Sequence, residues 1–389
     1  MGARRRDRLA ARRDAAQHRH GRAGAAGGDA DDGRAGRPEV FAGLPFAGRA
    51  RRAAPLLALA AVVLASGAGA GELDARMLLE RMRSAASSGN YQGTIVFSAS
   101  GSISSSRIWH YCVGDQTYER LEAQDGRLQR VFRHNDEVRT FWPQARVAVV
   151  ERREPLAGWS TKPQAIEERA LESYALREEG GEARVAGRAA RVLVLEPRDA
   201  LRYAQRLWVD RASGLMLRAD VLAPGQGVLE TAAFSEIELD VKPDPQRVLK
   251  GMRSAELPAA TRSAGVERRD GGEAWQVLRP AQRRTQLEAE GWALKADIPG
   301  FRLASCALRG IESGGGEVPV LQAVFSDGLT HVSLFVEPYR AERHRGALQA
   351  RLGATSTVTR RLDEHWITVV GDVPAATLER FAAALERRR

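Results

Sequence analysis

The sequence lacks the short motifs that mark common classes of enzyme. Its 389 residues contain no His-Glu-x-x-His, no Gly-x-Ser-x-Gly, no Gly-rich loop leading to a Lys and no Cys-x-x-Cys. These patterns supply zinc ligands, a serine nucleophile, a phosphate cradle and a redox dithiol, respectively. Their absence disfavours an enzyme, so we expect no catalytic residue, no cofactor and no metal site.

Cysteine is scarce, since the chain has only Cys112 and Cys306. They fall in different domains of the organisation described below, so a disulfide between them would clamp those domains together. The alternative is that each is a half-buried small side chain. His110 and Cys112 stand two positions apart on an expected strand and would share a face, which could suit a metal or a cysteine nucleophile. Two ligands alone do not make a site, so a structural role is favoured.

The apolar run from Pro55 to Ala65 is too short for a transmembrane helix, which needs about 20 residues. Arginines within residues 49–52 precede it, and the small residues Ala68–Ala70 follow it. A basic segment, a short apolar segment and a small-x-small sequence in this order are typical of a secretory signal peptide. We therefore expect residues 53–70 to form its apolar and cleavage regions, a mature chain that starts near Gly71, and a periplasmic location.

Residues 1–52 carry most of the formal net charge of +10. They have no periodic hydrophobic pattern and cannot bury enough surface to fold. They are either a disordered basic extension or the result of a start site assigned too far upstream, with translation beginning near Val40 or Leu44. We favour the second interpretation. Charges in the rest of the chain nearly balance, which disfavours a nucleic-acid-binding protein.

The spacing of apolar residues predicts one helix and then about ten strands. Leu73 to Ser88 has apolar residues at helical spacing, and the pattern then changes to a period of two. A hairpin loop is expected at Ser98–Ser106, a tight turn at Asn135-Asp136, and a helical insert from about Pro163 through Tyr174, before Gly180-Gly181. The expected strands are Tyr91–Ser98, Arg107–Val113, Leu128–His134, Glu137–Trp142, Arg146–Glu151, Arg191–Glu196, Arg206–Asp210, Leu215–Leu222, Val228–Phe234 and Glu236–Val241.

Some of these strands are apolar on both faces, as at Val147–Val150 and Val192–Leu195. A sheet with one face in water would alternate, so something must cover the second face. The candidates are the two helices, a bound lipid or another protein. Because so many strands exceed the usual size of a flat open sheet, we expect a large antiparallel half-barrel wrapped on helices.

A second, smaller α+β domain is expected after a Pro- and Arg-rich stretch from Lys242 to about Leu287 that holds one or two short strands near Trp275. We place the first domain at residues 71–255, a linker at 256–287 and the second domain at 288–389. The whole chain is therefore expected to be of the α+β class. The second domain should contain strands at Phe301–Leu308, Val318–Ser326, His331–Glu337 and Trp366–Gly371, and helices at Arg345–Leu352 and Pro374–Arg387.

Aromatic residues concentrate in the first domain and suggest a ligand cavity. A curled sheet lined with them could hold an acyl chain, and Arg130, Arg133 and Arg139 could meet an anionic headgroup. The alternative is an ordinary core with solvated arginines outside it. The candidate cavity residues are Trp109, Tyr111, Phe132, Phe141 and Trp142, with Trp159 nearby in the sequence.

Several segments in a fixed order resemble the MucB/RseB family, regulators of envelope-stress sigma factors in Gram-negative bacteria. The most specific are the Asn-Tyr-Gln-Gly-Thr and Ser-Asp-Gly-Leu sequences, and the similarity covers essentially all of residues 72–387. The segments that carry it are Leu78–Met82, Asn90–Thr94, Glu119–Leu121, Asn135–Arg139, Val149–Arg153, Phe325–Leu329, Val332–Pro338 and Val369–Pro374.

The resemblance implies a periplasmic protein that binds the periplasmic segment of a membrane-spanning anti-sigma factor and shields it from regulated proteolysis. It also implies a first domain similar to lipoprotein carriers, in which lipid or lipopolysaccharide releases the partner. It transfers no catalytic residue. The competing interpretation is a lipid or lipoprotein carrier with the same half-barrel, and a homo-oligomer stays open.

Overall fold

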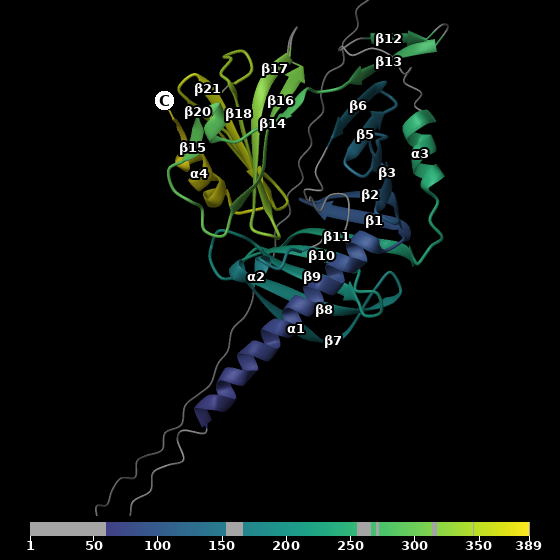
Figure 1. Cartoon of the computed structure of the whole chain (residues 1–389), viewed down its shortest axis with the longest axis vertical. Coiled ribbons are helices and arrows are strands. Elements are labelled where there is room, and N and C mark those ends of the chain that lie inside the picture. Colours follow the sequence, from purple (N-terminus) through teal and green to yellow (C-terminus); the bar gives the residue numbers. More distant parts are fainter. Residues whose placement is uncertain are drawn as a thin grey trace, which may run out of the picture. The chain divides into compact units, whose positions relative to one another are not determined.

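The computed structural model describes residues 60–152, 166–254, 266–269, 272–312, 317–344 and 346–388 (Figure 1). The basic extension, the start of the apolar run, Trp159 and Pro163 lie outside these residues. Helix α1 (Ala60–Ser88) contains the helix expected at Leu73–Ser88 but begins earlier. The added segment, residues 60–72, is rich in Ala and has no proline to end a helix, although its three glycines are poor helix formers. No helix in the described part of the chain is both long and apolar enough to cross a membrane.

A 13-stranded sheet, here called the large sheet, follows α1. Its order is β12-β13-β6-β5-β4-β3-β2-β1-β11-β10-β9-β8-β7, and every pair is antiparallel except β13 with β6, which is parallel. The sheet is therefore mixed, and not wholly antiparallel as expected. Its strands are β1 (Tyr91–Ala99), β2 (Ser102–Val113), β3 (Gln116–Ala123), β4 (Arg130–His134), β5 (Glu137–Trp142), β6 (Val147–Arg152), β7 (Tyr174–Val185), β8 (Arg188–Pro197), β9 (Ala204–Asp210), β10 (Met216–Ala223), β11 (Gly227–Leu239), β12 (Val266–Arg269) and β13 (Gly272–Leu278).

Both expected turns are present, and the one in the segment Ser98–Ser106 is shorter than the sequence suggested. Asn135 has φ +54° between β4 and β5, as a tight turn requires. The loop expected at Ser98–Ser106 is a two-residue turn, because Ala99 pairs directly with Ser102. Two expected strands merge into β11, whose register shifts opposite Thr94 and Ile95, where a β-bulge lies.

The helical insert expected to run through Tyr174 is wrong over most of its described length. Only α2 (Ala170–Ser173) is helical, and β7 begins at Tyr174. Gly180-Gly181 lies inside β7, where the register against β8 shifts. Tyr174 is buried, as expected for the apolar face of a helix, but it is buried as the first residue of a strand. An apolar residue at the end of a short segment does not distinguish a helix from a strand.

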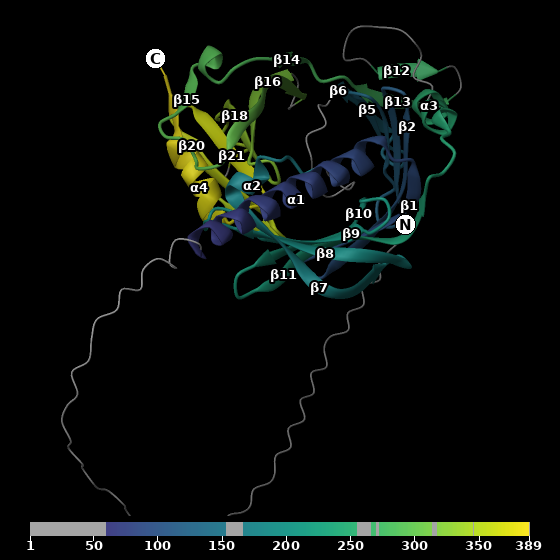
Figure 2. The same ribbon diagram turned by 60° about the horizontal axis from the view of Figure 1, so that its bottom comes forward.

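Helices cover both faces of the large sheet, which explains part of the doubly apolar pattern (Figure 2). Leu79 and Met82 of α1 pack against Leu193 and its neighbours on one face. Helix α3 (Pro245–Ser254), which lies in the Pro- and Arg-rich stretch where no helix was expected, packs on the other face over β3 and β4. Val194 is only 3% exposed, and the residues directly opposite it on the two neighbouring strands are Arg177 and Arg206. Long arginine stems can shield an apolar side chain in this way.

A seven-stranded sheet, here called the small sheet, occupies the C-terminal part of the chain, in the order β14-β16-β17-β18-β21-β20-β19. Helix α4 (Ala375–Ala384) packs on it through Leu378 and Phe381, as the sequence predicts, but the helix ends before Leu385. The remaining elements are β14 (Gln282–Arg284), η1 (Glu288–Glu290), β15 (Trp292–Leu294), β16 (Arg302–Glu312), β17 (Glu317–Ser326), β18 (His331–Pro338), β19 (Gln349–Leu352), β20 (Thr355–Leu362), β21 (His365–Gly371) and β22 (Leu385–Arg387).

The helix expected at Arg345–Leu352 is wrong, because Gln349–Leu352 forms β19 and pairs with β20. The turn between them contains Gly353 at φ +61°. A hairpin of this kind gives the edge segment backbone hydrogen bonds that an isolated short helix could not keep.

A buried ion pair connects the two sheets. Arg202 Nη1 lies 3.2 Å from Asp327 Oδ2, and both side chains have 0% exposure. Tyr174 donates a hydrogen bond to the same carboxylate at 3.2 Å, and Arg202 also donates to the carbonyl of Pro299 at 2.7 Å. Leu201 belongs to the apolar core of the small sheet, while Leu329 belongs to a core of the large sheet. The two cores therefore interlock around the pair.

Two turns of the small sheet approach the large sheet closely at glycines with positive φ. A Cβ on Gly328, at φ +97°, would lie 2.9 Å from the backbone nitrogen of Ala170. A Cβ on Gly353 would lie 2.8 Å from Glu230 Oε2. Both positions thus require glycine for conformation and for space.

Glu230 of β11 is 6% exposed and accepts a hydrogen bond at 3.1 Å from the backbone nitrogen of Ala354, next to Gly353. Burial raises its pKa to about 7; the hydrogen bond from Ala354 opposes this rise and the charge of Asp372 adds to it. The protonated carboxyl is therefore favoured when the two sheets are in contact.

Replacing Asp327 with Asn should lower the free energy of unfolding by about 2 kcal/mol, because the buried Arg202 would keep only Asp199, whose side chain is 34% exposed, as a counter-charge at 3.1 Å. Chemical denaturation followed by circular dichroism measures this change. The control is Glu172→Gln, which removes an exposed pair with Arg302 at 2.9 Å, also between the sheets, and should cost less than about 1 kcal/mol. Equal effects of the two substitutions would contradict the assignment.

Stability should fall as the pH rises from about 5 to about 8. The pKa of Glu230 is about 7 in the folded protein and ordinarily 4.5, so folding takes up a proton between these values. The raised pKa favours folding at low pH, and the loss at high pH is about 3 kcal/mol. Glu230→Gln keeps an acceptor for Ala354 and should flatten this part of the pH profile. A slope that survives the substitution would show that other groups cause it.

Candidate binding sites

Four of the five expected cavity residues lie together on the α3 side of the large sheet. Trp109, Tyr111, Phe132 and Phe141 are buried in one cluster, in which the rings of Phe132 and Phe141 meet edge to face at 5.7 Å. Trp142 is half-buried and stands outside this cluster. The alternation along each strand brings the four residues to one face, as the sequence predicts.

Helix α3 fills the space in front of these aromatic residues. Val248 and Met252 of α3 belong to the same cluster, and Val248 has 0% exposure. The contact is closest at Gly251, where a Cβ would lie 2.0 Å from Cε1 of Phe132. The aromatic face is therefore a packed core in this structure, and an acyl chain could reach it only if α3 moved.

A basic pocket of about 360 Å³ opens beside the aromatic cluster, between α3 and strands β3 and β4. Arg120 and Arg247 lie over the ring of Trp109, at 4.7 and 5.8 Å from its centroid. Glu122 pairs with Arg120 at 2.6 Å and with Arg130 at 3.2 Å. The positive charges exceed the negative ones in this pocket, which suits an anionic group. Its lining residues are Arg120, Arg130, Phe132, Asp244, Gln246, Arg247, Lys250 and Gly251.

Of the three arginines expected to meet a headgroup, only Arg130 lines the basic pocket. Arg139 donates to the carbonyl of Met252 and pairs with Glu137 at 2.7 Å, so it holds the end of α3. Arg133 pairs with Glu119 at 3.6 Å on the opposite face. The sequence did not indicate Lys250 or Arg247, because its pattern predicts no helix at residues 245–254.

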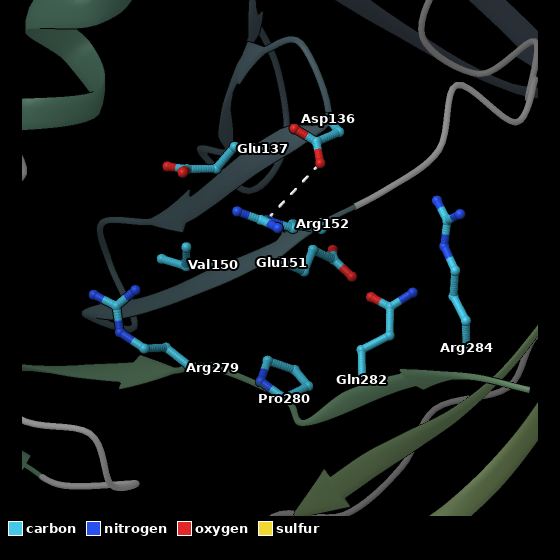
Figure 3. A pocket seen from close by; sticks show the side chains of 9 residues that line it. All are labelled: Asp136, Glu137, Val150, Glu151, Arg152, Arg279, Pro280, Gln282 and Arg284. Atoms are coloured by element: carbon cyan, nitrogen blue, oxygen red, sulfur yellow. Dashed lines mark ion pairs between the residues drawn. The ribbon is translucent and has the colours of Figure 1, made fainter.

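A second cavity, of about 560 Å³, lies between the β5–β6 hairpin and the segment that leads into β14 (Figure 3). Asp136 and Arg152 on one wall form an ion pair at 3.8 Å, and Gln282 stands on the other wall. Glu151, in the same wall, pairs with Arg309 of the small sheet at 3.1 Å. Its lining is mostly charged and suits a polar peptide segment better than a lipid chain. The lining residues are Asp136, Glu137, Val150, Glu151, Arg152, Arg279, Pro280, Gln282 and Arg284.

The two cysteines are both free thiols, so the disulfide considered from the sequence is not formed. Cys112 is on β2 in the large sheet and half-buried, whereas Cys306 is on β16 in the small sheet and 7% exposed. His110 and Cys112 share a face, as expected. Among the described residues, no three His, Cys, Asp or Glu side chains gather as a metal site would require.

Comparison with known proteins shows similarity to one family along most of the chain. The sequence model of the MucB/RseB N-terminal domain matches residues 74–252, and that of the MucB/RseB C-terminal domain matches residues 286–386. The chain is 30% identical over 326 residues to the Sigma factor AlgU regulatory protein MucB of Pseudomonas aeruginosa, covering 80% of this chain and 90% of that protein. It is 24% identical over 307 residues to the Sigma-E factor regulatory protein RseB of Escherichia coli, covering 78% and 88%.

Solved structures show the same similarity. The structure of the Pseudomonas aeruginosa MucA/MucB complex matches with a TM-score of 0.58 and 28% identity, covering 81% of this chain and 99% of that one. A crystal structure of MucB in complex with MucA(peri) matches with a TM-score of 0.56 and 29% identity, covering 80% and 98%.

Gly251→Ala should release α3 from the aromatic face. Alanine favours a helix over glycine by about 1 kcal/mol, but its Cβ cannot fit against Phe132, so packing outweighs propensity. We expect stronger binding of an apolar fluorescent dye and a change in tryptophan emission from Trp109 and Trp275. The control is Gly180→Ala, where a Cβ would meet nothing within 4 Å. The same signals in both variants would refute the close contact.

Proposed function

Because the chain belongs to the MucB/RseB family, we propose that it is a periplasmic regulator that binds the periplasmic region of a membrane anti-sigma factor. In this role it protects that region from regulated proteolysis and negatively regulates an envelope-stress sigma factor. A lipid or lipopolysaccharide would release the partner. The observation that carries the proposal is the similarity to MucB bound to MucA, which extends over both parts of the chain.

The proposed division of the chain follows the sequence expectations. Residues 71–255 would form a lipoprotein-carrier-like first domain, 256–287 a linker and 288–389 the second domain. We infer that the large sheet is a half-barrel wrapped on α1, since thirteen strands exceed the usual size of a flat sheet. The mature protein would begin near Gly71 after removal of a signal peptide. N-terminal sequencing of the secreted protein tests this boundary. The mass of the same secreted protein in solution would show whether it forms a homo-oligomer.

The partner site that the geometry supports is the charged cavity between the β5–β6 hairpin and β14. Both parts of the chain form it, and the Glu151–Arg309 pair joins its wall to the small sheet. A segment bound there would contact both parts at once. This arrangement favours a regulator over a carrier, because a carrier needs only the large sheet.

The lipid site that the geometry supports is the aromatic cluster with the basic pocket beside it. The cluster would receive acyl chains, and Arg130, Arg120 and Lys250 would meet an anionic headgroup. Occupancy requires that α3 leave Phe132, so the lipid competes with the protein's own helix. A ligand relieves inhibition only through its higher affinity for the partner-free form, and a coupling of 1 to 3 kcal/mol changes partner affinity about 5- to 150-fold.

The purified chain should bind the periplasmic region of a MucA-type anti-sigma factor, and anionic lipid should weaken that binding. Calorimetry with and without lipopolysaccharide measures both effects, and proteolysis of the partner region measures protection. A charge-matched scrambled segment is the control for the partner. Glu151→Gln, which weakens the wall of the charged cavity, should lower partner affinity and leave lipid binding unchanged.

One outcome would decide against the regulator, and a second would decide against lipid sensing alone. The first is no retention of any anti-sigma segment together with stoichiometric delivery of lipid to an acceptor protein, which would establish a carrier. The second is equal partner affinity with and without bound lipid, which would remove the sensing role and leave only the binding role.

A further inference from the structure

A cluster of reactive side chains lies on the face of the large sheet opposite α3. Cys112 Sγ lies 3.4 Å from Nε2 of His110, and Nδ1 of His110 lies 3.0 Å from Oε1 of Glu119. A carboxylate can only accept a hydrogen bond, so Nδ1 carries the ring hydrogen and Nε2 presents its lone pair to the sulfur. A thiol, an imidazole and a carboxylate in this order form the arrangement of an activated cysteine nucleophile.

The surroundings favour the charged form of His110. Its side chain is 2% exposed, and burial lowers its pKa, but the hydrogen bonds with Cys112 and Glu119 and their charges outweigh burial and raise the pKa. The imidazolium is the species that remains after the thiol gives its proton to Nε2. The cluster therefore stabilises the product of that proton transfer.

Tyr91 supplies an unused donor at the same place. Its ring stacks on that of His110 with the centroids 4.8 Å apart, and its hydroxyl is buried with no hydrogen-bond partner among the described residues. Burial raises the pKa of Tyr91, and the charges of Glu119 and Cys112 raise it further, so the hydroxyl keeps its hydrogen. A buried hydroxyl without a partner is a hydrogen-bond donor that the cluster does not yet use.

An open approach leads to this cluster. A cavity of about 710 Å³ runs beside the end of α1 and is lined by Ser88, Asn90 and Tyr91 among others. Cys112 is tied to this rim, because its thiol donates to the carbonyl of Ser87 at 2.8 Å and its backbone nitrogen donates to Oδ1 of Asn90 at 2.8 Å. Cys112 does not line the cavity, but its side chain is only half-buried, so a small reactant has access to the sulfur.

We propose that Cys112 is an oxidation site for hydroperoxides, activated by His110 with Glu119 as the residue that positions the imidazole. The S–H bond rotates from the carbonyl of Ser87 toward His110 and gives its proton to Nε2, and the sulfur then attacks the terminal oxygen of the peroxide. The S–O bond forms while the O–O bond breaks, so the sulfur is oxidised to a sulfenic acid and the peroxide is reduced to an alkoxide. The alkoxide takes the proton from His110 and leaves as an alcohol, or as water when the reactant is hydrogen peroxide.

This chemistry does not depend on the proposed partner and lipid sites. It would change the hydrogen bond between Cys112 and the end of α1. The S–H group that donates to Ser87 at the end of α1 is replaced by S–OH. Oxidation thus alters the contact between α1 and β2 at the centre of the large sheet. It would make the protein responsive to peroxide without a second cysteine.

Cys306 serves as a matched control within the same chain. It is 7% exposed in the small sheet, and burial together with the charges of Glu290 and Glu288 raises its pKa to about 11. At neutral pH it holds its proton, so it should be inert toward peroxide. Because Cys306 is also more buried than Cys112, the variants at His110 and Glu119 are what separate activation of the thiol from its exposure.

The test treats the full, reduced chain with hydrogen peroxide at pH 7, traps sulfenic acid with dimedone and locates the label by peptide mass spectrometry. We expect label at Cys112, none at Cys306, and a rate about 10-fold above that of glutathione, whose thiol is only a few per cent ionised at this pH. His110→Gln should slow labelling about 100-fold. Glu119→Gln should slow it about 10-fold and move the pH profile of the rate to higher pH, which a purely structural role would not do.

A Cys112 rate in the unaltered protein no higher than that of glutathione would overturn the proposal. So would an unchanged rate and pH profile in a Glu119→Gln variant that melts at the same temperature as the unaltered chain. If His110→Gln fails to fold, these two measurements still decide the question.

Discussion

The ion pair between Arg202 and Asp327 is the interaction on which the arrangement of the two sheets depends. Two fully buried charges are costly unless each has its partner and its remaining hydrogen bonds. Here the partners come from both sides: Tyr174 from the large sheet, and the carbonyl of Pro299 from the chain leading into the small sheet. Asp199 at 3.1 Å and the backbone nitrogens of Leu329 and Thr330 add local partners, but only contact between the sheets brings the two buried charges together. Leu201 packs in the core of the small sheet, and Leu329 packs in a core of the large sheet. These two leucines add buried apolar area to a contact whose geometry the Arg202–Asp327 ion pair specifies.

The large sheet resolves its excess of apolar surface with its own helices. Helix α1 covers one face, and α3 covers the aromatic face so closely that Gly251 leaves no room for a methyl group. A ligand for that face must therefore supply more contact than Val248 and Met252 already do. Such competition sets a threshold: weakly bound apolar molecules do not displace the helix, whereas a molecule with both acyl chains and an anionic group also gains from the basic pocket.

Periodicity in the sequence predicted most strands because the alternation of buried and exposed residues is a local property. It gave Glu137–Trp142 with its exact bounds, and it brought Trp109, Tyr111, Phe132 and Phe141 to one face. It failed where tertiary contacts decide: Gln349–Leu352 is one strand of a hairpin, Tyr174 begins a strand, and Pro245–Ser254 is a helix that packs on Phe132. The basic pocket was missed for the same reason, since two of its four positive side chains lie on that helix. The pairing of Arg202 with Asp327 joins residues far apart in the chain, and no local pattern indicates it.

The glycines at 328 and 353 have a consequence for how variation among related proteins should be understood. Each is the tip of a turn that presses on the large sheet at a distance no side chain tolerates. Substitution at either tip would separate the sheets without touching a bound partner or lipid. If glycine is invariant at these positions, the reason would be the packing of the two sheets against each other. A mutagenesis experiment that measures only activity would wrongly assign such a glycine to a ligand site.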